Sequence, residues 1–219
     1  MKITNLSDNN TILNHFVSEL RDVDIHNDSM RFRNNIERIG QILAYEVSKS
    51  LEYENAEVVT PLGVAQTCHI ADNIVVASIL RAGLPLHNGI LSFFDKAENC
   101  FVSAYRKYIN ETEFDVHVEY IASPSLDGKV VILADPMLAT GSSMELAYKA
   151  LLTHGTPKKV IICSVIASRF AIDYVSKHLP SDKCEVFTAV IDADLNEHAY
   201  IVPGLGDAGD LAFGEKLSR

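Results

Sequence analysis

The chain has 219 residues, of which 47% are hydrophobic and 22% charged, a composition typical of a globular protein with a substantial core. Its formal net charge of −10 argues against a nucleic-acid partner, because binding to phosphate backbones requires a basic face. No segment has the length and apolarity of a secretory signal or a membrane span. We therefore expect a cytoplasmic protein without a membrane partner.

The 4 cysteines and 8 histidines are dispersed along the chain, without Cys-x-x-Cys or paired-ligand spacing. The cysteines are Cys68, Cys100, Cys163 and Cys184. We expect them to be free thiols of a reducing compartment, and we expect no zinc site.

The N-terminal part of the sequence predicts helices. The polar residues 1–10 allow no assignment. Apolar residues at helical spacing predict a short amphipathic helix near residues 13–20 and a long one over residues 32–51. We assign residues 1–55 to an N-terminal helical segment and interpret the long helix as scaffold or as a subunit contact.

The first clear core strand lies near the middle of the chain. Residues 58–60 favour a short strand, and Pro61-Leu62-Gly63 favours a turn. The apolar run Ile74–Leu80 predicts a buried strand, and an apolar helical pattern follows from Leu84. Arg81 stands directly at the carboxyl end of that strand, which makes a candidate phosphate loop. The alternative is an ordinary turn with a solvated Arg81.

A hairpin is predicted over residues 100–122. Residues 100–105 favour a strand that passes into Arg106, and residues 116–120 alternate between apolar and polar side chains. This hairpin interrupts the strand–helix rhythm, as an active-site flap or a dimer arm would. The cation at its base is placed to close over an anion, with surface charge as the alternative.

A strand, a loop and a helix follow one another around residues 130–151. Val130–Ala134 predicts a buried strand, which Asp135-Pro136 ends because proline cannot donate to a ladder. The small, hydroxylated residues 140–143 open a helical pattern, a geometry that binds phosphate through unpaired N–H groups. The Asp135 carboxylate is placed to meet an accompanying cation. Plain turn and cap chemistry is the alternative.

The remaining strands complete the predicted sheet. Residues 159–166 and 185–191 predict buried strands on either side of a helix that Ser168 caps. Alternating strands and helices favour a parallel sheet, in which ligands bind beyond the carboxyl ends of the strands. Arg81, Arg106 and Asp135 all follow predicted strands, so they converge on one edge and indicate a phosphate-rich ligand.

The stretch 196–210 is rich in glycine. Glycine lets backbone N–H and C=O groups approach a flat ligand closely. The flanking Tyr200, Ile201 and Phe213 favour a packed loop, and a flexible end is the alternative.

Three motifs in this order resemble those of uracil phosphoribosyltransferases, members of the type I phosphoribosyltransferase superfamily. They are Ile-Leu-Arg-Ala-Gly-Leu, Asp-Pro-Met-Leu-Ala-Thr-Gly and Tyr-Ile-Val-Pro-Gly-Leu-Gly-Asp-Ala-Gly-Asp, within a match from about Arg31 to Gly214. The resemblance implies an α/β fold with a parallel sheet flanked by helices, in a single domain over residues 1–219. It also implies a β-hairpin arm or flap over residues 100–122 and a C-terminal base-binding hood over residues 192–219.

The resemblance implies roles for individual residues. Phosphoribosyl pyrophosphate would be bound by Asp135, Pro136, Met137, Leu138, Ala139, Thr140, Gly141, Ser142 and Ser143. Arg81 and Arg106 would contact its pyrophosphate and, with Asp135, act as the catalytic residues. Uracil would be held by Ile201, Gly206, Asp207 and Ala208, largely through the backbone. Asp207 would also reach phosphoribosyl pyrophosphate and, through it, the cofactor Mg²⁺.

The implied reaction converts uracil and phosphoribosyl pyrophosphate to UMP and pyrophosphate, in pyrimidine salvage. Two alternatives stay open: a non-catalytic or regulatory nucleotide- or RNA-binding relative, and the same chemistry on another base. Ser142 and Leu211 depart from the family pattern, which usually has a glycine and a basic residue there. The long helix and the hairpin favour a homodimer or a higher homo-oligomer, and regulation by GTP is left open.

Overall fold

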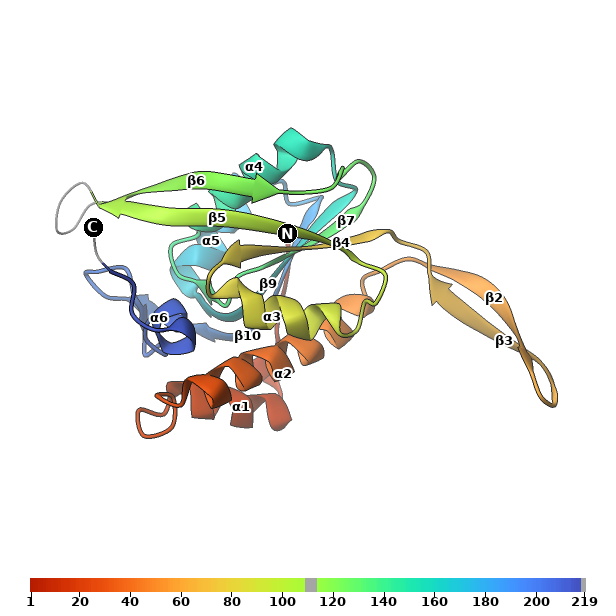
Figure 1. The fold of residues 1–219 in the computed structure, drawn as a ribbon, viewed down its shortest axis with the longest axis horizontal. Helices are drawn as coiled ribbons and strands as arrows, with labels where there is room; N and C mark the ends of the chain where they lie inside the picture. Colours follow the sequence, from red (N-terminus) through yellow and green to blue (C-terminus); the bar gives the residue numbers. More distant parts are fainter. Residues whose placement is uncertain (109–113, 218–219) are drawn as a thin grey trace.

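The computed structural model describes residues 1–108 and 114–217, with side chains for all of these except residues 104–119. In this part of the chain the core is an 8-stranded, mostly parallel sheet (Figure 1). Its order is β1 (Lys2–Asn5), β10 (Cys184–Asp192), β9 (Lys159–Ser168), β7 (Val130–Ala134), β4 (Ile74–Leu80), β5 (Glu98–Tyr108) and β6 (Phe114–Ala122), with β8 (Met137–Leu138) beside β9. The predicted α/β class with a parallel sheet is confirmed.

Helices cover both faces of the sheet (Figure 1). The helices are α1 (Ile12–Arg21), α2 (Ser29–Ser48), α3 (Gly83–Leu91), α4 (Ser142–Leu151) and α5 (Arg169–His178). Successive strand residues point to opposite faces, so Val76 and Ile132 pack with α1, α2 and α3, whereas Val75 and Val131 pack with α4 and α5. The central strands are therefore buried on both sides, which is why they are continuous apolar runs in the sequence.

The strand β1 at one edge of the sheet was not predicted, because residues 1–10 are polar. It pairs in parallel with β10, with Lys2 opposite Glu185. A single turn of 3-10 helix, Leu6–Asp8, then leads into α1, which Thr11 caps by accepting from the Leu13 N–H. A second such turn, Leu152–His154, follows α4. No helix within the described residues is both long and apolar enough to cross a membrane.

Two further strands, β2 (Tyr53–Thr60) and β3 (Gly63–Ile70), form a separate antiparallel hairpin that projects from the body (Figure 1). Only its tip, the short strand and turn around residues 58–63, was predicted. Lys158 fixes its base through ion pairs with Asp72 at 2.8 Å and Glu52 at 2.6 Å. The apolar side chains of Val59 and Leu62 are 83% and 100% exposed.

The predicted hairpin over residues 100–122 is present as β5 and β6, which pair antiparallel. Residues 109–113, which include the expected polar turn, lie outside the described residues. Leu80 at the end of β4 pairs with Ser103 of β5, so β5 continues past the edge where β4 ends. The hairpin therefore starts beside the carboxyl ends of the central strands.

A buried histidine makes the fold sensitive to acid. His87 of α3 is 2% exposed; its Nε2 lies 2.7 Å from Asn99 Oδ1, and its ring stacks on Phe101 at 5.1 Å. Burial lowers the pKa of His87, and the hydrogen bond that its ring donates to Asn99 Oδ1 opposes this shift only in part. The unfolded chain therefore binds a proton that the folded protein excludes, and stability is lost as the pH falls below about 6.5.

We expect His87→Gln to reduce the fall in Tm between pH 7.5 and pH 5.5, because glutamine carries no proton to exclude. Differential scanning calorimetry of both proteins at the two pH values measures this. His198→Gln, at a histidine whose side chain is 58% exposed, serves as the control and should keep the acid sensitivity of the parent. Equal acid sensitivity in His87→Gln would contradict the prediction.

Candidate active site

The predicted phosphate loop, residues 135–143, follows β7. Its first half is ordered by the backbone: the Asp135 N–H donates to Cys163 O at 3.1 Å, and Asp135 Oδ1 accepts from the Met137 N–H at 3.2 Å. Met137 and Leu138 form β8 against β9, a strand that sequence reasoning missed. Two residues were too short a run to predict. Backbone hydrogen bonds therefore hold this half of the loop in place, and they leave the Asp135 side chain half-buried.

The second half of the phosphate loop forms the N-terminus of α4. Gly141 is the N-cap with φ +85°, and a Cβ there would lie 2.8 Å from Tyr174 Cδ1. The hydroxyls of Thr140 and Ser142 lie 2.8 Å apart. Gly141 has no side chain to cap the helix start, and Thr140 Oγ1 accepts from the Ser142 N–H at 3.4 Å. N–H groups and hydroxyls therefore gather at the positive end of the helix, which is a geometry suited to phosphate. Ser142 therefore adds a hydroxyl that is held within the loop by Thr140.

The loop after β4 opens at the same edge of the sheet. β4 and β7 are neighbours, with Ser78 opposite Ala134, and a Cβ on Gly83 would lie 3.0 Å from Ala134 O. The Leu80–Arg81 peptide is cis. The side chain of Arg81 is 42% exposed, so part of its guanidinium faces solvent.

The C-terminal segment folds back onto this loop. It contains the short strands β11 (Asp194–Leu195) and β12 (Ile201–Val202) and the helix α6 (Ala208–Phe213). Arg81 donates to Asp210 Oδ1 at 2.9 Å and to Gly214 O at 3.2 Å. Two of the motifs, which are far apart in the sequence, are thus joined by an ion pair.

Arg106 is only partly placed. Its backbone lies on β5 and pairs with Val116, beyond the Leu80–Ser103 pair at the edge of the sheet. The side chain of Arg106 lies outside the described residues. Its contact with the ligand stays a prediction.

The predicted base loop, residues 201–208, is packed only in part, because the flanking Tyr200 and Phe213, which favoured a packed loop, are 38% and 40% exposed. Ile201 is 4% and Ala208 2% exposed, and both belong to the core cluster on the α2 side. Gly206, with φ +93°, presents its backbone to solvent. Gly204 has φ +63°, and a Cβ there would lie 2.0 Å from Ile201 O, so the turn admits only glycine. Rigid backbone groups are therefore available beside an open surface.

Sequence reasoning missed the pair that supports this loop. Arg21 donates to both oxygens of Asp192 at 2.8 Å and to Gly204 O at 3.1 Å, and Asp192 Oδ2 accepts the Gly204 N–H at 2.9 Å. Burial alone would raise the pKa of Asp192, but the bonds from Arg21 and Gly204 outweigh it and lower the pKa. The acidic residue directly after a buried strand was the one available indication.

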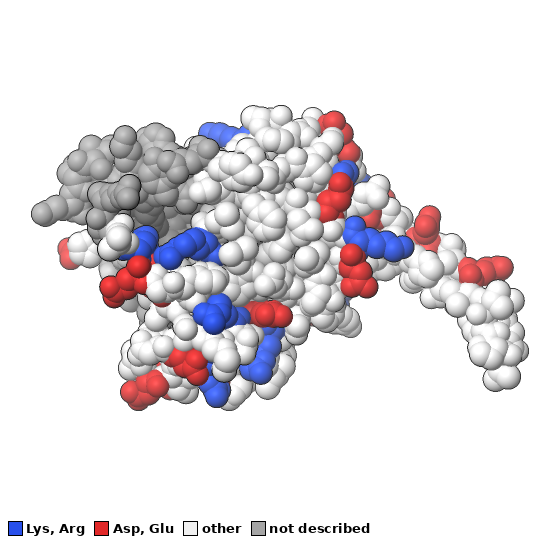
Figure 2. Space-filling model, in the orientation of Figure 1, with Lys and Arg blue, Asp and Glu red and all other residues white. Residues whose placement is uncertain are grey.

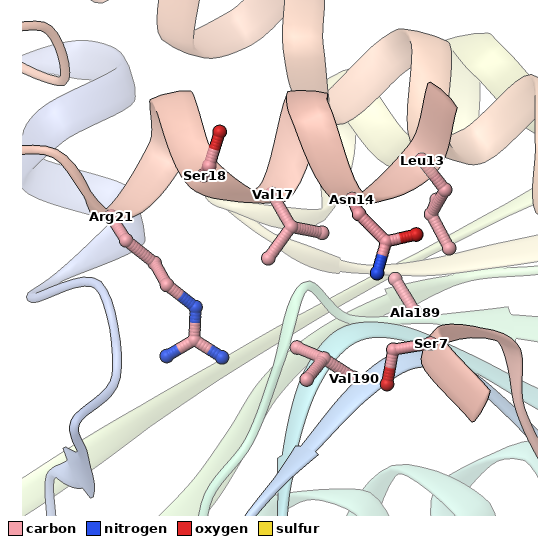
Figure 3. A pocket seen from close by; sticks show the side chains of 8 residues that line it. All are labelled: Ser7, Leu13, Asn14, Val17, Ser18, Arg21, Ala189 and Val190. Atoms are coloured by element: carbon pink, nitrogen blue, oxygen red, sulfur yellow. The ribbon is translucent and has the colours of Figure 1, made fainter. Parts of the chain in front are cut away.

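Arg21 also lines a small pocket between α1 and β10, of about 190 Å³ (Figure 3). The other lining residues are Ser7, Leu13, Asn14, Val17, Ser18, Ala189 and Val190. A cavity of this size is smaller than drug-sized ligand sites, so we assign it no ligand.

Charged groups of both signs gather where the C-terminal segment meets Arg81. Asp207 Oδ1 caps α6 by accepting from the N–H groups of Gly209 at 2.9 Å and Asp210 at 3.0 Å. Its Oδ2 accepts from Lys216 Nζ at 2.9 Å. Burial would raise the pKa of Asp207, but these bonds lower it, so the group is ionised. Figure 2 shows acidic and basic groups interspersed on the face it displays.

Comparisons with known proteins identify the family of the chain. A family model described as uracil phosphoribosyltransferase matches residues 7–215. A protein of that name from Porphyromonas gingivalis is 57% identical over 217 residues, covering 99% of this chain and 100% of its own length. Another from Methanothermobacter thermautotrophicus is 42% identical over 189 residues, covering 85% of each chain.

Solved structures with a similar fold are known. The AQ2163 protein from Aquifex aeolicus superposes with a TM-score of 0.86 at 32% identity, covering 99% of this chain and 100% of that one. A hypoxanthine phosphoribosyltransferase from Staphylococcus aureus, at 13% identity, covers 85% of this chain and 83% of that one with a TM-score of 0.50, and shares the fold alone. With the family match over almost the whole length, the chain belongs to the uracil phosphoribosyltransferase family.

Proposed function

We propose that this protein transfers the phosphoribosyl group of phosphoribosyl pyrophosphate to uracil, giving UMP and pyrophosphate in pyrimidine salvage. It is a pentosyltransferase, in keeping with the family to which it belongs. The observation that carries the proposal is the Arg81–Asp210 ion pair, which holds the C-terminal segment against the β4 loop at the edge where the phosphate loop opens. One site can then hold a base and a sugar with phosphates at both ends.

The phosphate loop suits the ribose 5-phosphate. We place that phosphate against the N–H groups at the start of α4 and the hydroxyls of Thr140, Ser142 and Ser143. The backbone and side chains of residues 135–139 would border the ribose. Arg81 and Arg106 would take the pyrophosphate, because guanidinium groups bind phosphate oxygens with two parallel hydrogen bonds.

The base loop suits uracil. Ile201, Gly206 and Ala208 would present backbone N–H and C=O groups to the polar edge of the ring. Once a bound base excludes water from these groups, a base that leaves them unpaired is penalised. Recognition through the backbone does not by itself exclude another pyrimidine, so the same chemistry on another base is the second candidate. The exposed Gly206 backbone is the observation that keeps it open.

The reaction needs positioning and charge stabilisation rather than a covalent nucleophile. Uracil N1 forms a bond to ribose C1 while the bond from C1 to pyrophosphate breaks, so positive charge grows on the sugar and negative charge on the leaving group. Asp135 would stabilise the sugar charge, and Arg81 and Arg106 the leaving group. We further propose that the hairpin of residues 100–122 acts as a lid that excludes water from the activated sugar.

The residues fit a Mg²⁺ ion that is shared with the substrate. Within the described residues, no group of three or more His, Cys, Asp and Glu side chains could hold a metal ion. Mg²⁺ commonly takes one or two carboxylates together with substrate phosphates, and the ionised Asp207 offers such an oxygen. When bound, the ion would neutralise charge on the pyrophosphate.

Two further proposals concern RNA binding and the cellular compartment. The acidic net charge and the interspersed charges of Figure 2 weigh against an RNA-binding role. We propose a cytoplasmic setting, in keeping with the free thiols of Cys68, Cys100, Cys163 and Cys184.

We propose a homodimer or higher homo-oligomer, in which a second copy of the chain covers the β2–β3 hairpin. An isolated two-stranded hairpin is marginally stable in water, yet this one is fixed at its base and exposes Val59 opposite Val64. We expect light scattering after gel filtration to give at least twice the protomer mass. Val59→Lys with Val64→Lys should shift the population toward monomer, whereas Val23→Lys, at a site 68% exposed elsewhere, should not.

One assay tests the proposed reaction: release of pyrophosphate from phosphoribosyl pyrophosphate and Mg²⁺ across a panel of free bases. We expect turnover with uracil and little or none with purine bases. Turnover with another pyrimidine alone would favour the second candidate, and no release with any base would overturn the enzymatic proposal. Addition of GTP to the same assay tests for regulation by that nucleotide.

A further inference from the structure

Two carboxylates and two cations form one cluster where the C-terminal segment meets the β4 loop. Asp210 Oδ1 accepts from Arg81 at 2.9 Å and lies 3.4 Å from Lys216 Nζ. Lys216 Nζ also lies 2.9 Å from Asp207 Oδ2. The formal charges of these four groups cancel, so in the free protein this cluster carries no net charge.

The two carboxylate oxygens of Asp207 have different hydrogen-bond partners. Oδ1 accepts the N–H groups of Gly209 and Asp210 and so fixes the start of α6. Oδ2 is the oxygen that Lys216 covers with its ammonium. Anything that is to contact Asp207 through Oδ2 must therefore compete with Lys216.

Lys216 is free to change partner. Its side chain is 60% exposed, compared with 32% for Asp207 and 27% for Asp210. A lysine ammonium is a compact charge on a flexible stem, so it can follow an anion that arrives nearby. Because Lys216 and Arg81 share Asp210 Oδ1, a pyrophosphate that binds Arg81 lies within reach of Lys216.

We propose that Lys216 is a further pyrophosphate-binding residue, whose ammonium exchanges the Asp207 carboxylate for a pyrophosphate oxygen when phosphoribosyl pyrophosphate binds. This inference rests on the proposed function. The exchange leaves Asp207 Oδ2 open at the moment when substrate and Mg²⁺ arrive together. Leu211 cannot take this role, because its side chain carries neither a charge nor a hydrogen-bond donor.

The exchange predicts that loss of the Lys216 ammonium weakens the binding of pyrophosphate and strengthens the binding of Mg²⁺. Without the ammonium, pyrophosphate loses a charged hydrogen bond, so its affinity should fall by about 10- to 100-fold. Asp207 loses its competitor at the same time, so half-saturation with Mg²⁺ should need less of the ion. A merely structural role for Lys216 would not move the two in opposite directions.

The test uses Lys216→Met, the conservative Lys216→Arg, and Lys177→Met as a matched control in the exposed last turn of α5. Isothermal titration calorimetry with inorganic pyrophosphate, with and without Mg²⁺, gives binding without turnover. We expect weaker pyrophosphate binding in Lys216→Met, near-parental binding in Lys216→Arg, and no change in Lys177→Met. In kinetics, KM for phosphoribosyl pyrophosphate should rise and KM for uracil should stay within about two-fold.

Parental pyrophosphate affinity in Lys216→Met would overturn the inference, as would an equal rise in both KM values. These results are distinct from a failure of the proposed function. If the parent protein binds pyrophosphate but turns over no base, the reaction is wrong, while weaker binding in Lys216→Met would still support the role of Lys216.

Discussion

Asp135→Asn is expected to lower kcat about 100-fold or more while leaving the fold intact. The carboxylate stands at the carboxyl end of β7, half-buried, where we place the ribose. Its negative charge would stabilise the positive charge that grows on the sugar, and loss of one such electrostatic group costs about 100- to 1,000-fold. Asparagine keeps the Oδ1 acceptor for the Met137 N–H, so this turn is preserved while the negative charge is lost.

Steady-state kinetics with saturating uracil and phosphoribosyl pyrophosphate measure this effect, and circular dichroism melting checks the fold. Asp173→Asn, at an exposed position on α5, is the matched control and should keep parental kcat. Full turnover by a folded Asp135→Asn protein would remove Asp135 from the catalytic residues.

Arg21→Met is expected to destabilise the protein by about 3 kcal/mol, because the buried carboxylate of Asp192 keeps the Gly204 N–H but loses its counter-ion. Asp192 is 7% exposed and Arg21 23%, so water cannot replace the lost partner well. For a chain of this length, that loss corresponds to a fall in Tm of roughly 6–12 °C. The same change frees Gly204 O, so the base loop should loosen and KM for uracil should rise more than KM for phosphoribosyl pyrophosphate.

The pair also makes a prediction for pH. The pKa of Asp192 is lowered in the folded protein, so its contribution to stability is present above the unfolded pKa and is lost as the pH falls through the folded pKa. Urea denaturation should be measured for the parent and for Arg21→Met from neutral pH to a pH below the folded pKa of Asp192. The free energies of unfolding of the two proteins should converge at the low-pH end. Arg31→Met breaks an ion pair with Glu19 in which Arg31 is 50% exposed, and should cost no more than about 1 kcal/mol. A destabilised Arg21→Met protein with unchanged KM for uracil would show that the pair supports the fold but not the base loop.

The central strands were predictable because their burial on both faces leaves continuous apolar runs. β4, β7 and β9 lie where such runs end in Arg81, Asp135 and the cap Ser168. Since parallel strands bring their carboxyl ends to one edge, the convergence of Arg81 and Asp135 followed from topology. Of the apolar neighbours that favoured a packed base loop, Ile201 is buried, whereas Tyr200 and Phe213 are exposed.

Other features leave no local pattern. β3 was missed because both faces of the β2–β3 hairpin are exposed within the protomer, so no alternation of burial selects a face. β1 is a polar edge strand, stabilised by its backbone pairing with β10. The Arg21–Asp192 pair and the contact between Arg81 and the Asp210 carboxylate that Lys216 shares join residues far apart in the sequence. No fixed spacing in a single sequence predicts such contacts.

The pairing of β1 with β10 has a consequence for how the molecule is made. Lys2 lies opposite Glu185, and Arg21 meets Asp192 across 171 residues of chain. Such non-local contacts raise the contact order, and the loop-closure entropy must be overcome before they form. During synthesis, α1 can pack against β10 only after almost the whole chain has been made. The loop around Gly204, which Arg21 and Asp192 support, is therefore completed only when distant parts of the chain have met.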